Sequence, residues 1–107
     1  MAAIPITTEM FYEMTSGSTP VLVDYWAPWC TYCRRIEPAY EKIAEAYGDR
    51  VIVTKVNIDR EQLLAMQEQI EVIPTLVLYK NSRAIGSIVA PESKDMIDTF
   101  LQEALEN

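Results

Sequence analysis

Two cysteines are the residues of this 107-residue chain whose type and spacing best suit chemistry. They stand as Cys30-Thr31-Tyr32-Cys33, between a buried-strand pattern and a helical pattern. Such a junction places Cys30 at a helix N-terminus, where unpaired amides and the helix dipole favour an anion. The thiolate is the reactive form of cysteine, so this placement lowers the pKa of the thiol and favours redox chemistry.

Three other roles stay open for the cysteines: a structural disulfide, a metal site, or two buried thiols without chemistry. A disulfide that closes so short a loop restrains the unfolded chain very little. Zinc usually takes four Cys or His ligands, and the chain has two cysteines and no histidine, which leaves only a cluster shared between two chains. The absence of histidine also excludes a Cys–His nucleophile pair. With three glycines in the chain, there is no glycine-rich phosphate loop.

Two charged residues interrupt apolar segments. Asp24 lies within Val21–Trp26, where burial would raise the pKa of its carboxyl unless the position is at a solvated edge. Lys55 lies in a second apolar segment, and opposite charges in adjacent buried strands would most simply be partners. Pro74 precedes a further strand and, taken alone, is an ordinary strand-opening proline.

The elements that position these residues follow from hydrophobic periodicity. A kink is expected at Pro38, because proline removes a backbone donor and clashes with the preceding turn. The turn 80–83 is short enough for an antiparallel hairpin. We predict an α/β fold in one domain, 1–107, with a mixed sheet of about five strands flanked by four helices. The expected strands are 4–6, 21–26, 51–58, 75–79 and 84–89, and the expected helices are 8–15, 33–47, 60–70 and a last helix capped by Ser93.

Composition excludes several classes of partner. The formal net charge is −7, and an acidic surface repels phosphate backbones and anionic lipids, so we expect neither nucleic acid nor membrane as a partner. No apolar run approaches the ~20 residues of a membrane span. The N-terminal residues carry neither a basic lead nor a sustained apolar stretch, so we expect no secretory signal and a cytoplasmic location.

The chain resembles the thioredoxin family from about Ile6 to Leu105. The resemblance is carried by four landmarks in family order and spacing. They are Val-Leu-Val-Asp-Tyr-Trp-Ala-Pro-Trp-Cys ending at Cys30, Pro38 in the kinked helix, Lys-Val-Asn-Ile-Asp from Lys55 to Asp59, and Ile73-Pro74-Thr75. A Cys-x-x-Cys motif alone is weak evidence, whereas the four together are strong.

The resemblance implies a protein-disulfide reductase with no cofactor beyond its own redox-active disulfide. In that family Cys30 is the attacking thiol and Cys33 the resolving thiol, while Asp24 handles protons for Cys33, with Lys55 beside it. The Ile73–Pro74 bond is expected to be cis. A shallow substrate groove would be formed by Trp29, Ile73, Pro74, Thr75 and Ala90. The implied partners are disulfide-containing proteins and a flavoprotein thioredoxin reductase, with the protein acting as a monomer.

The chain departs from the family at several positions. Thr31-Tyr32 replaces the usual Gly-Pro between the cysteines, so we expect these residues to tune the redox potential. Tyr32 restores an N–H that proline lacks, and we expect this N–H to point toward the Cys30 sulfur. Ala90 stands where a glycine is usual, and Ser82 replaces the hairpin glycine. Three alternatives remain: a more oxidising protein of the same fold, a binding module without turnover, and a dimeric iron–sulfur carrier bridged by Cys30.

Overall fold

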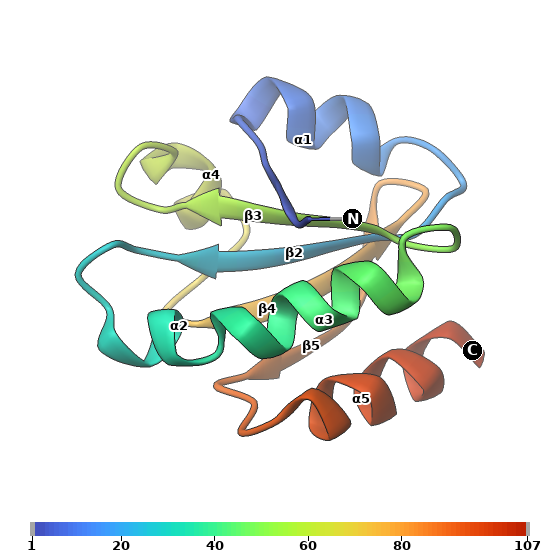
Figure 1. Ribbon diagram of the computed structural model, residues 1–107. Coiled ribbons are helices and arrows are strands. Elements are labelled where there is room, and N and C mark those ends of the chain that lie inside the picture. Colours follow the sequence, from blue (N-terminus) through green and yellow to red (C-terminus); the bar gives the residue numbers. More distant parts are fainter. Residues whose placement is uncertain (1, 107) are drawn as a thin grey trace.

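The computed structural model describes residues 2–106 and contains a five-stranded mixed sheet in the order β1-β3-β2-β4-β5 (Figure 1). β1, β3 and β2 are parallel, whereas β4 is antiparallel to both β2 and β5. The strands are β1 (Ile4–Pro5), β2 (Val21–Trp26), β3 (Ile52–Asn57), β4 (Thr75–Lys80) and β5 (Arg83–Val89). The predicted mixed sheet and the predicted hairpin are confirmed.

Helices cover both faces of this sheet (Figure 1). Apolar side chains of α1 and α4 pack on one face, and those of α3 and α5 pack on the other. The helices are α1 (Thr8–Thr15), α2 (Thr31–Arg35), α3 (Glu37–Tyr47), α4 (Gln62–Gln67) and α5 (Lys94–Glu106). Within residues 2–106, no helix has the length and apolar character needed to cross a membrane.

The number of helices is a correction to the sequence-based prediction, which gave four where the structure has five. The expected kinked helix is divided at Ile36, which ends α2 and precedes α3. Pro38 lies directly after this point, and its ring has no N–H to donate back to Arg34 and clashes with that carbonyl. The kink is therefore a break, and α2 becomes a separate short helix that begins directly after Cys30.

The strand β2 is buried on both faces and sorts its side chains between two cores. Val21, Val23 and Tyr25 pack with α1 and α4, whereas Leu22 packs with α3 and α5. Side chains alternate along a strand, so Asp24 is on the same face as Leu22. Asp24, near the carboxyl end of β2, is thus a buried acid on the α2–α3 side of the sheet. The first cysteine follows six residues later on the same side.

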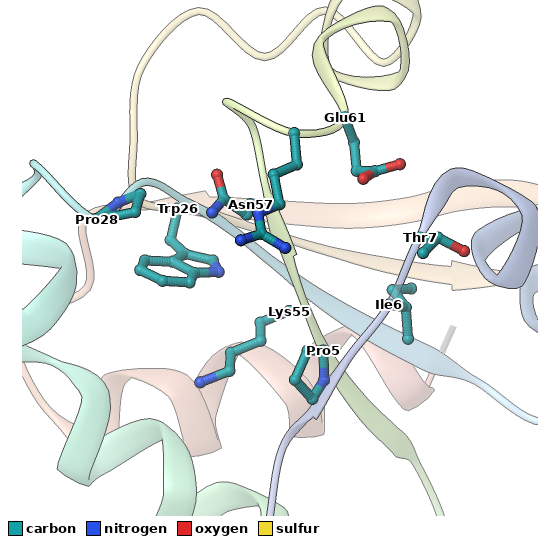
Figure 2. Close-up of a pocket in the computed structure, with 9 residues that line it drawn as sticks. Pro5, Ile6, Thr7, Trp26, Pro28, Lys55, Asn57 and Glu61 are labelled. Carbon is teal, nitrogen blue, oxygen red and sulfur yellow. The ribbon is translucent and has the colours of Figure 1, made fainter.

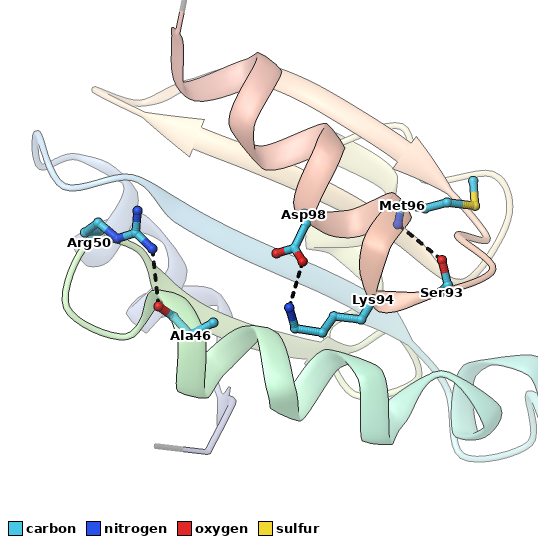
Figure 3. Close-up of polar contacts among 6 residues, drawn as sticks. All are labelled: Ala46, Arg50, Ser93, Lys94, Met96 and Asp98. Carbon is cyan, nitrogen blue, oxygen red and sulfur yellow. Dashed lines mark hydrogen bonds and ion pairs between the residues drawn. The ribbon is translucent and has the colours of Figure 1, made fainter.

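The last helix is fixed at its first turn by polar contacts (Figure 3). The predicted cap is confirmed, since Ser93 Oγ accepts the N–H of Met96 at 3.2 Å. Lys94 Nζ lies 2.7 Å from Asp98 Oδ2, one helical turn later. These contacts stabilise the first turn of α5, which begins shortly after Ala90 and Pro91, the two residues that follow β5.

Candidate active site

Cys30 and Cys33 form a disulfide at the N-terminus of α2, with their Cα atoms 5.3 Å apart. Cys30 is the N-cap residue, and its Sγ accepts the N–H of Cys33 at 3.1 Å. Cys30 is 9% exposed and Cys33 is 2% exposed. The outer sulfur is therefore that of Cys30, and it is the sulfur that receives a hydrogen bond at the positive end of the helix.

The donor to this sulfur differs from the sequence-based prediction. We expected the N–H of Tyr32, but the group that reaches Cys30 Sγ is the N–H of Cys33. The physical reason is the geometry of an N-cap, whose side chain accepts from the second or third helical residue. Here Cys33 is the third helical residue after the cap. The N–H of Tyr32 contributes to the field of the helix N-terminus without bonding the sulfur directly.

Asp24 is a buried carboxyl on the strand that leads into the cysteine loop. It is 2% exposed, and its Oδ1 has no hydrogen-bond partner among the residues that the structure describes. Burial raises the pKa of this carboxyl from 3.8 to about 7, the nearby ammonium of Lys55 opposes the rise, and Glu37 adds to it. Such a group can exchange protons near neutral pH.

Lys55 lies beside Asp24 in the sheet but has a different partner. The two residues are paired in the register of β2 and β3, as we expected from their positions in adjacent buried strands. The ammonium group, however, pairs with Glu37 Oε1 at 3.6 Å, which corrects the simple expectation of an Asp24–Lys55 pair. The long side chain of lysine lets its charge reach partly exposed surroundings at the start of α3, where desolvation is smaller.

Lys55 also lines a pocket of about 440 Å³ that sequence reasoning did not predict (Figure 2). Its Nζ lies 5.5 Å from the centre of the Trp26 ring, and Figure 2 shows the two side chains together on one wall. Asn57 and Glu61 contribute further polar groups. The lining comes from three strands and the segment before α4, so only the folded chain brings these residues together.

The backbone that leads into β4 and the residue after β5 were also predicted to belong to the site. Ile73 packs against the cluster that contains both cysteines. The Ile73–Pro74 peptide bond is cis, as the resemblance implied. The carbonyl of Pro74 accepts the N–H of Ala90 at 2.9 Å, and the hydroxyl of Thr75 donates to the carbonyl of Val72 at 2.6 Å. A hydrogen bond thus joins the segment 73–75 to Ala90, and Ile73 brings this segment into contact with the cysteine cluster.

Trp29 lies at the other side of the cysteine loop. It is 65% exposed, and its indole N–H lies 3.0 and 3.2 Å from the two carboxylate oxygens of Asp59. Sequence reasoning named Trp29 but missed Asp59, the residue that orients it. The position of Asp59 directly after β3 was the available signal, because the carboxyl ends of parallel β2 and β3 meet at the same edge of the sheet.

Tyr32 joins the active-site helix to the loop after β5. Its hydroxyl donates to the carbonyl oxygen of Pro91 at 3.1 Å, and the guanidinium carbon of Arg35 lies 5.9 Å from the centre of its ring. Thr31, the other residue between the cysteines, begins α2 and is exposed. Pro91 was not among the predicted site residues.

The chemistry open to this arrangement is thiol–disulfide exchange. The two sulfurs already form a bond that can accept two electrons, and a buried acid with a pKa near neutrality lies on the adjoining strand. No group of three or more Cys, Asp or Glu side chains is placed to hold a metal within residues 2–106. The redox centre that the structure shows is the disulfide between the side chains of Cys30 and Cys33.

Comparison with known proteins agrees with this chemistry. The thioredoxin family model matches residues 2–103. A thioredoxin from Alicyclobacillus acidocaldarius is 36% identical over 98% of this chain and 100% of that protein. A thioredoxin from Buchnera aphidicola is 44% identical over 88% of this chain and 94% of that protein. The crystal structure of Malassezia sympodialis thioredoxin (Mala s 13) superposes with a TM-score of 0.88 at 30% identity, covering 97% of this chain and 95% of that one.

The solved thioredoxin therefore shares the fold described above. Thioredoxins are protein-disulfide reductases that need no cofactor, because the redox-active disulfide belongs to the polypeptide. The disulfide at the start of α2 and the match over nearly the whole chain lead to one conclusion. This chain belongs to the thioredoxin family and is a thiol–disulfide oxidoreductase.

Proposed function

We propose that this protein is a cytoplasmic, monomeric electron carrier, folded as one domain over residues 1–107, that reduces protein disulfides. In this proposal a flavoprotein thioredoxin reductase restores the dithiol after each cycle. The observation that carries the proposal is the asymmetry of the cysteine pair. Cys30 is the outer sulfur at the helix N-terminus and accepts an N–H, whereas Cys33 is buried behind it.

The reaction follows from this asymmetry. In the reduced protein the Cys30 thiolate attacks one sulfur of the substrate disulfide, a mixed disulfide forms, and the other substrate sulfur leaves as a thiolate that takes up a proton. The Cys33 thiol then loses its proton and attacks Cys30 Sγ. The mixed disulfide breaks, the Cys30–Cys33 disulfide forms, and the second substrate thiol leaves. Two electrons pass from the protein to the substrate.

Asp24 is the proposed acceptor of the Cys33 proton. Its carboxylate is the stronger base when its pKa lies near 7 rather than near 3.8, so it can take a proton from a thiol in the second step. Lys55 is the proposed tuning residue, since its ammonium opposes the rise in the pKa of Asp24. A water molecule can relay the proton between Cys33 and the carboxylate.

The proposed substrate groove lies between Trp29 on one side and the backbone of residues 73–75 and Ala90 on the other. An extended substrate chain would lay its apolar side chains against the exposed ring of Trp29 and pair its backbone with that of the groove. The residues assigned to this groove are Trp29, Ile73, Pro74, Thr75 and Ala90. Thr31 and Tyr32 are proposed to tune the redox potential through the amides of the first turn of α2.

Insulin reduction tests the proposal. The purified protein, dithiothreitol and insulin are mixed, and precipitation of the free insulin B chain is followed by turbidity. We expect precipitation well ahead of a control with dithiothreitol alone, and loss of this acceleration in Cys30→Ser. Replacing dithiothreitol by NADPH and a flavoprotein thioredoxin reductase should sustain the reaction. A protein that binds insulin without accelerating its reduction would be a binding module, and the proposal would be wrong.

A further inference from the structure

The contact between Tyr32 and Pro91 connects two parts of the active site that are distant in sequence. Tyr32 stands between the two cysteines, and Pro91 follows β5, 59 residues later. The hydroxyl of Tyr32 is partly buried and donates to the Pro91 carbonyl at 3.1 Å. Arg35, one turn further along, places its guanidinium over the Tyr32 ring. The ring is therefore held both at its face and at its hydroxyl.

The backbone that receives this bond is in an unfavourable conformation for its sequence. Ala90 has a φ of 46°, in the left-handed region that residues with a Cβ adopt only at a cost. Its N–H donates to the carbonyl of Pro74. Pro91 follows directly, is buried, and has its own φ restricted by its ring. Two hydrogen bonds, one to each residue, thus hold Ala90–Pro91 in place.

We propose that Tyr32 is a positioning residue for substrate docking, which acts by tying Pro91 to the active-site helix. The bond fixes Ala90–Pro91 against the active-site helix, so that an extended substrate chain meets an ordered surface beside the cysteines. This inference rests on the proposed function, because it assigns Ala90 to the substrate groove. It adds a specificity device made by the residue that replaces the usual proline between the cysteines.

The device has a selective consequence. A protein disulfide must align its flanking backbone along Ala90–Pro91 before Cys30 can attack, so it benefits from a groove that is already ordered. A small aromatic disulfide has no flanking backbone and reacts at the sulfur alone. Loss of the Tyr32 hydroxyl should therefore slow the reaction with a protein disulfide more than the reaction with a small one.

Tyr32→Phe isolates the hydroxyl, because it keeps the ring, its contact with Arg35 and the backbone N–H. The matched control is Tyr12→Phe, which removes an exposed hydroxyl that bonds Gln67 on the face of α1 and α4. Each protein is reduced, freed of reductant and mixed under single-turnover conditions with insulin or with dipyridyl disulfide. The oxidation of each protein by the added disulfide is followed by its tryptophan fluorescence. Exchange of the Ala90 amide hydrogen, measured by NMR, reports on the loop independently.

For Tyr32→Phe, we expect the ratio of the insulin rate constant to the dipyridyl disulfide rate constant to fall about fivefold. That factor is about 1 kcal/mol at 1.4 kcal/mol per tenfold, the net worth of one neutral hydrogen bond. Exchange of the Ala90 amide should become faster, and Tyr12→Phe should keep the wild-type ratio. An unchanged ratio, or an equal fall of both rates, overturns the inference. A wild-type protein that fails to reduce insulin overturns the proposed function itself, which separates the two failures.

Discussion

Asp24 and Lys55 face each other across the parallel strands β2 and β3, yet the ammonium group of Lys55 pairs with Glu37. The buried carboxyl is thereby left with an opposite charge nearby but outside an ion pair, and with Oδ1 free of hydrogen bonds from any residue that the structure describes. Burial raises the pKa of Asp24 to about 7, the ammonium of Lys55 opposes the rise, and the carboxylate of Glu37 adds to it.

Glu37→Gln should lower the pKa of Asp24. The negative charge of Glu37 contributes to the rise in this pKa, and its loss also frees the ammonium of Lys55 to stabilise the Asp24 carboxylate. The pKa can be read from the chemical shift of the Asp24 carboxyl carbon during an NMR titration. Glu45→Gln, an exposed position on the same helix α3, is the control and should leave the titration where it is. A pKa that stays at about 7 in Glu37→Gln would show that Glu37 has no such effect.

Asp24→Asn should stabilise the protein, and more so as the pH rises. Between pH 3.8 and about 7, Asp24 is ionised in the unfolded chain but still protonated in the folded protein. The free energy of unfolding of the wild type therefore falls as the pH rises through this window and stays constant above it. At about 1.4 kcal/mol per pKa unit, the full loss is about 4 kcal/mol. Urea unfolding of the oxidised proteins at about pH 4 and about pH 8 measures the difference.

The same variant should reduce disulfides more slowly at neutral pH, because Cys33 loses its proton acceptor. This opposition of stability and rate separates a functional acid from a structural one. If Asp24→Asn is less stable than the wild type and keeps the full exchange rate, Asp24 serves only as a structural acceptor.

Cys30→Ser should reduce insulin no faster than dithiothreitol alone, whereas Cys33→Ser should accumulate a mixed disulfide with its substrate. The reason is the order of the two sulfurs, since Cys30 is the outer residue at the helix N-terminus, 9% exposed, whereas Cys33 is 2% exposed behind it. The trapped species is seen on a non-reducing gel as a band that dithiothreitol removes. A trapped complex formed by Cys30→Ser through Cys33 would reverse the assignment of the two thiols.

The double variant Thr31→Gly/Tyr32→Pro should be a stronger reductant than this protein. Proline removes the second amide donor of α2, whose field favours the Cys30 thiolate and therefore the reduced form. A change of about 1 kcal/mol corresponds to about 20 mV, so the potential should fall by roughly that amount. Equilibration of each protein with a glutathione or dithiothreitol buffer measures the potential. A wild-type potential at or below about −270 mV would contradict the argument.

Local signals were sufficient for most of the fold. The apolar segment Val21–Trp26 is buried along almost its whole length, and the periodic positions after Cys33 form the buried stripe of α3. Such patterns are local because burial repeats every two residues in a strand and every three or four in a helix. Pro38 was also a local signal, although its effect was a break rather than a kink. The position of a proline in the sequence cannot distinguish a kink from a break, since the angle between the two helical segments depends on how the second segment packs.

The cysteine motif and the buried acid could likewise be identified from the sequence, because each depends only on the element that contains it. The cis geometry of Ile73–Pro74 could not be derived from the residues themselves, and only the resemblance to a family indicated it. An isolated prolyl bond prefers the trans form by a small margin, so tertiary contacts decide which isomer is present.

The amino-acid sequence by itself determined the order of the strands, the place of Asp24 within an apolar strand and the position of Cys30 at a strand–helix junction. Only the tertiary structure decided which distant side chains meet: Lys55 with Glu37, Trp29 with Asp59, and Tyr32 with Pro91. The physical reason is that a buried or half-buried polar atom bonds whichever group the crossovers of the sheet bring within about 3 Å of it. That group is set by the packing of whole elements, so the residues around one partner do not by themselves identify the other.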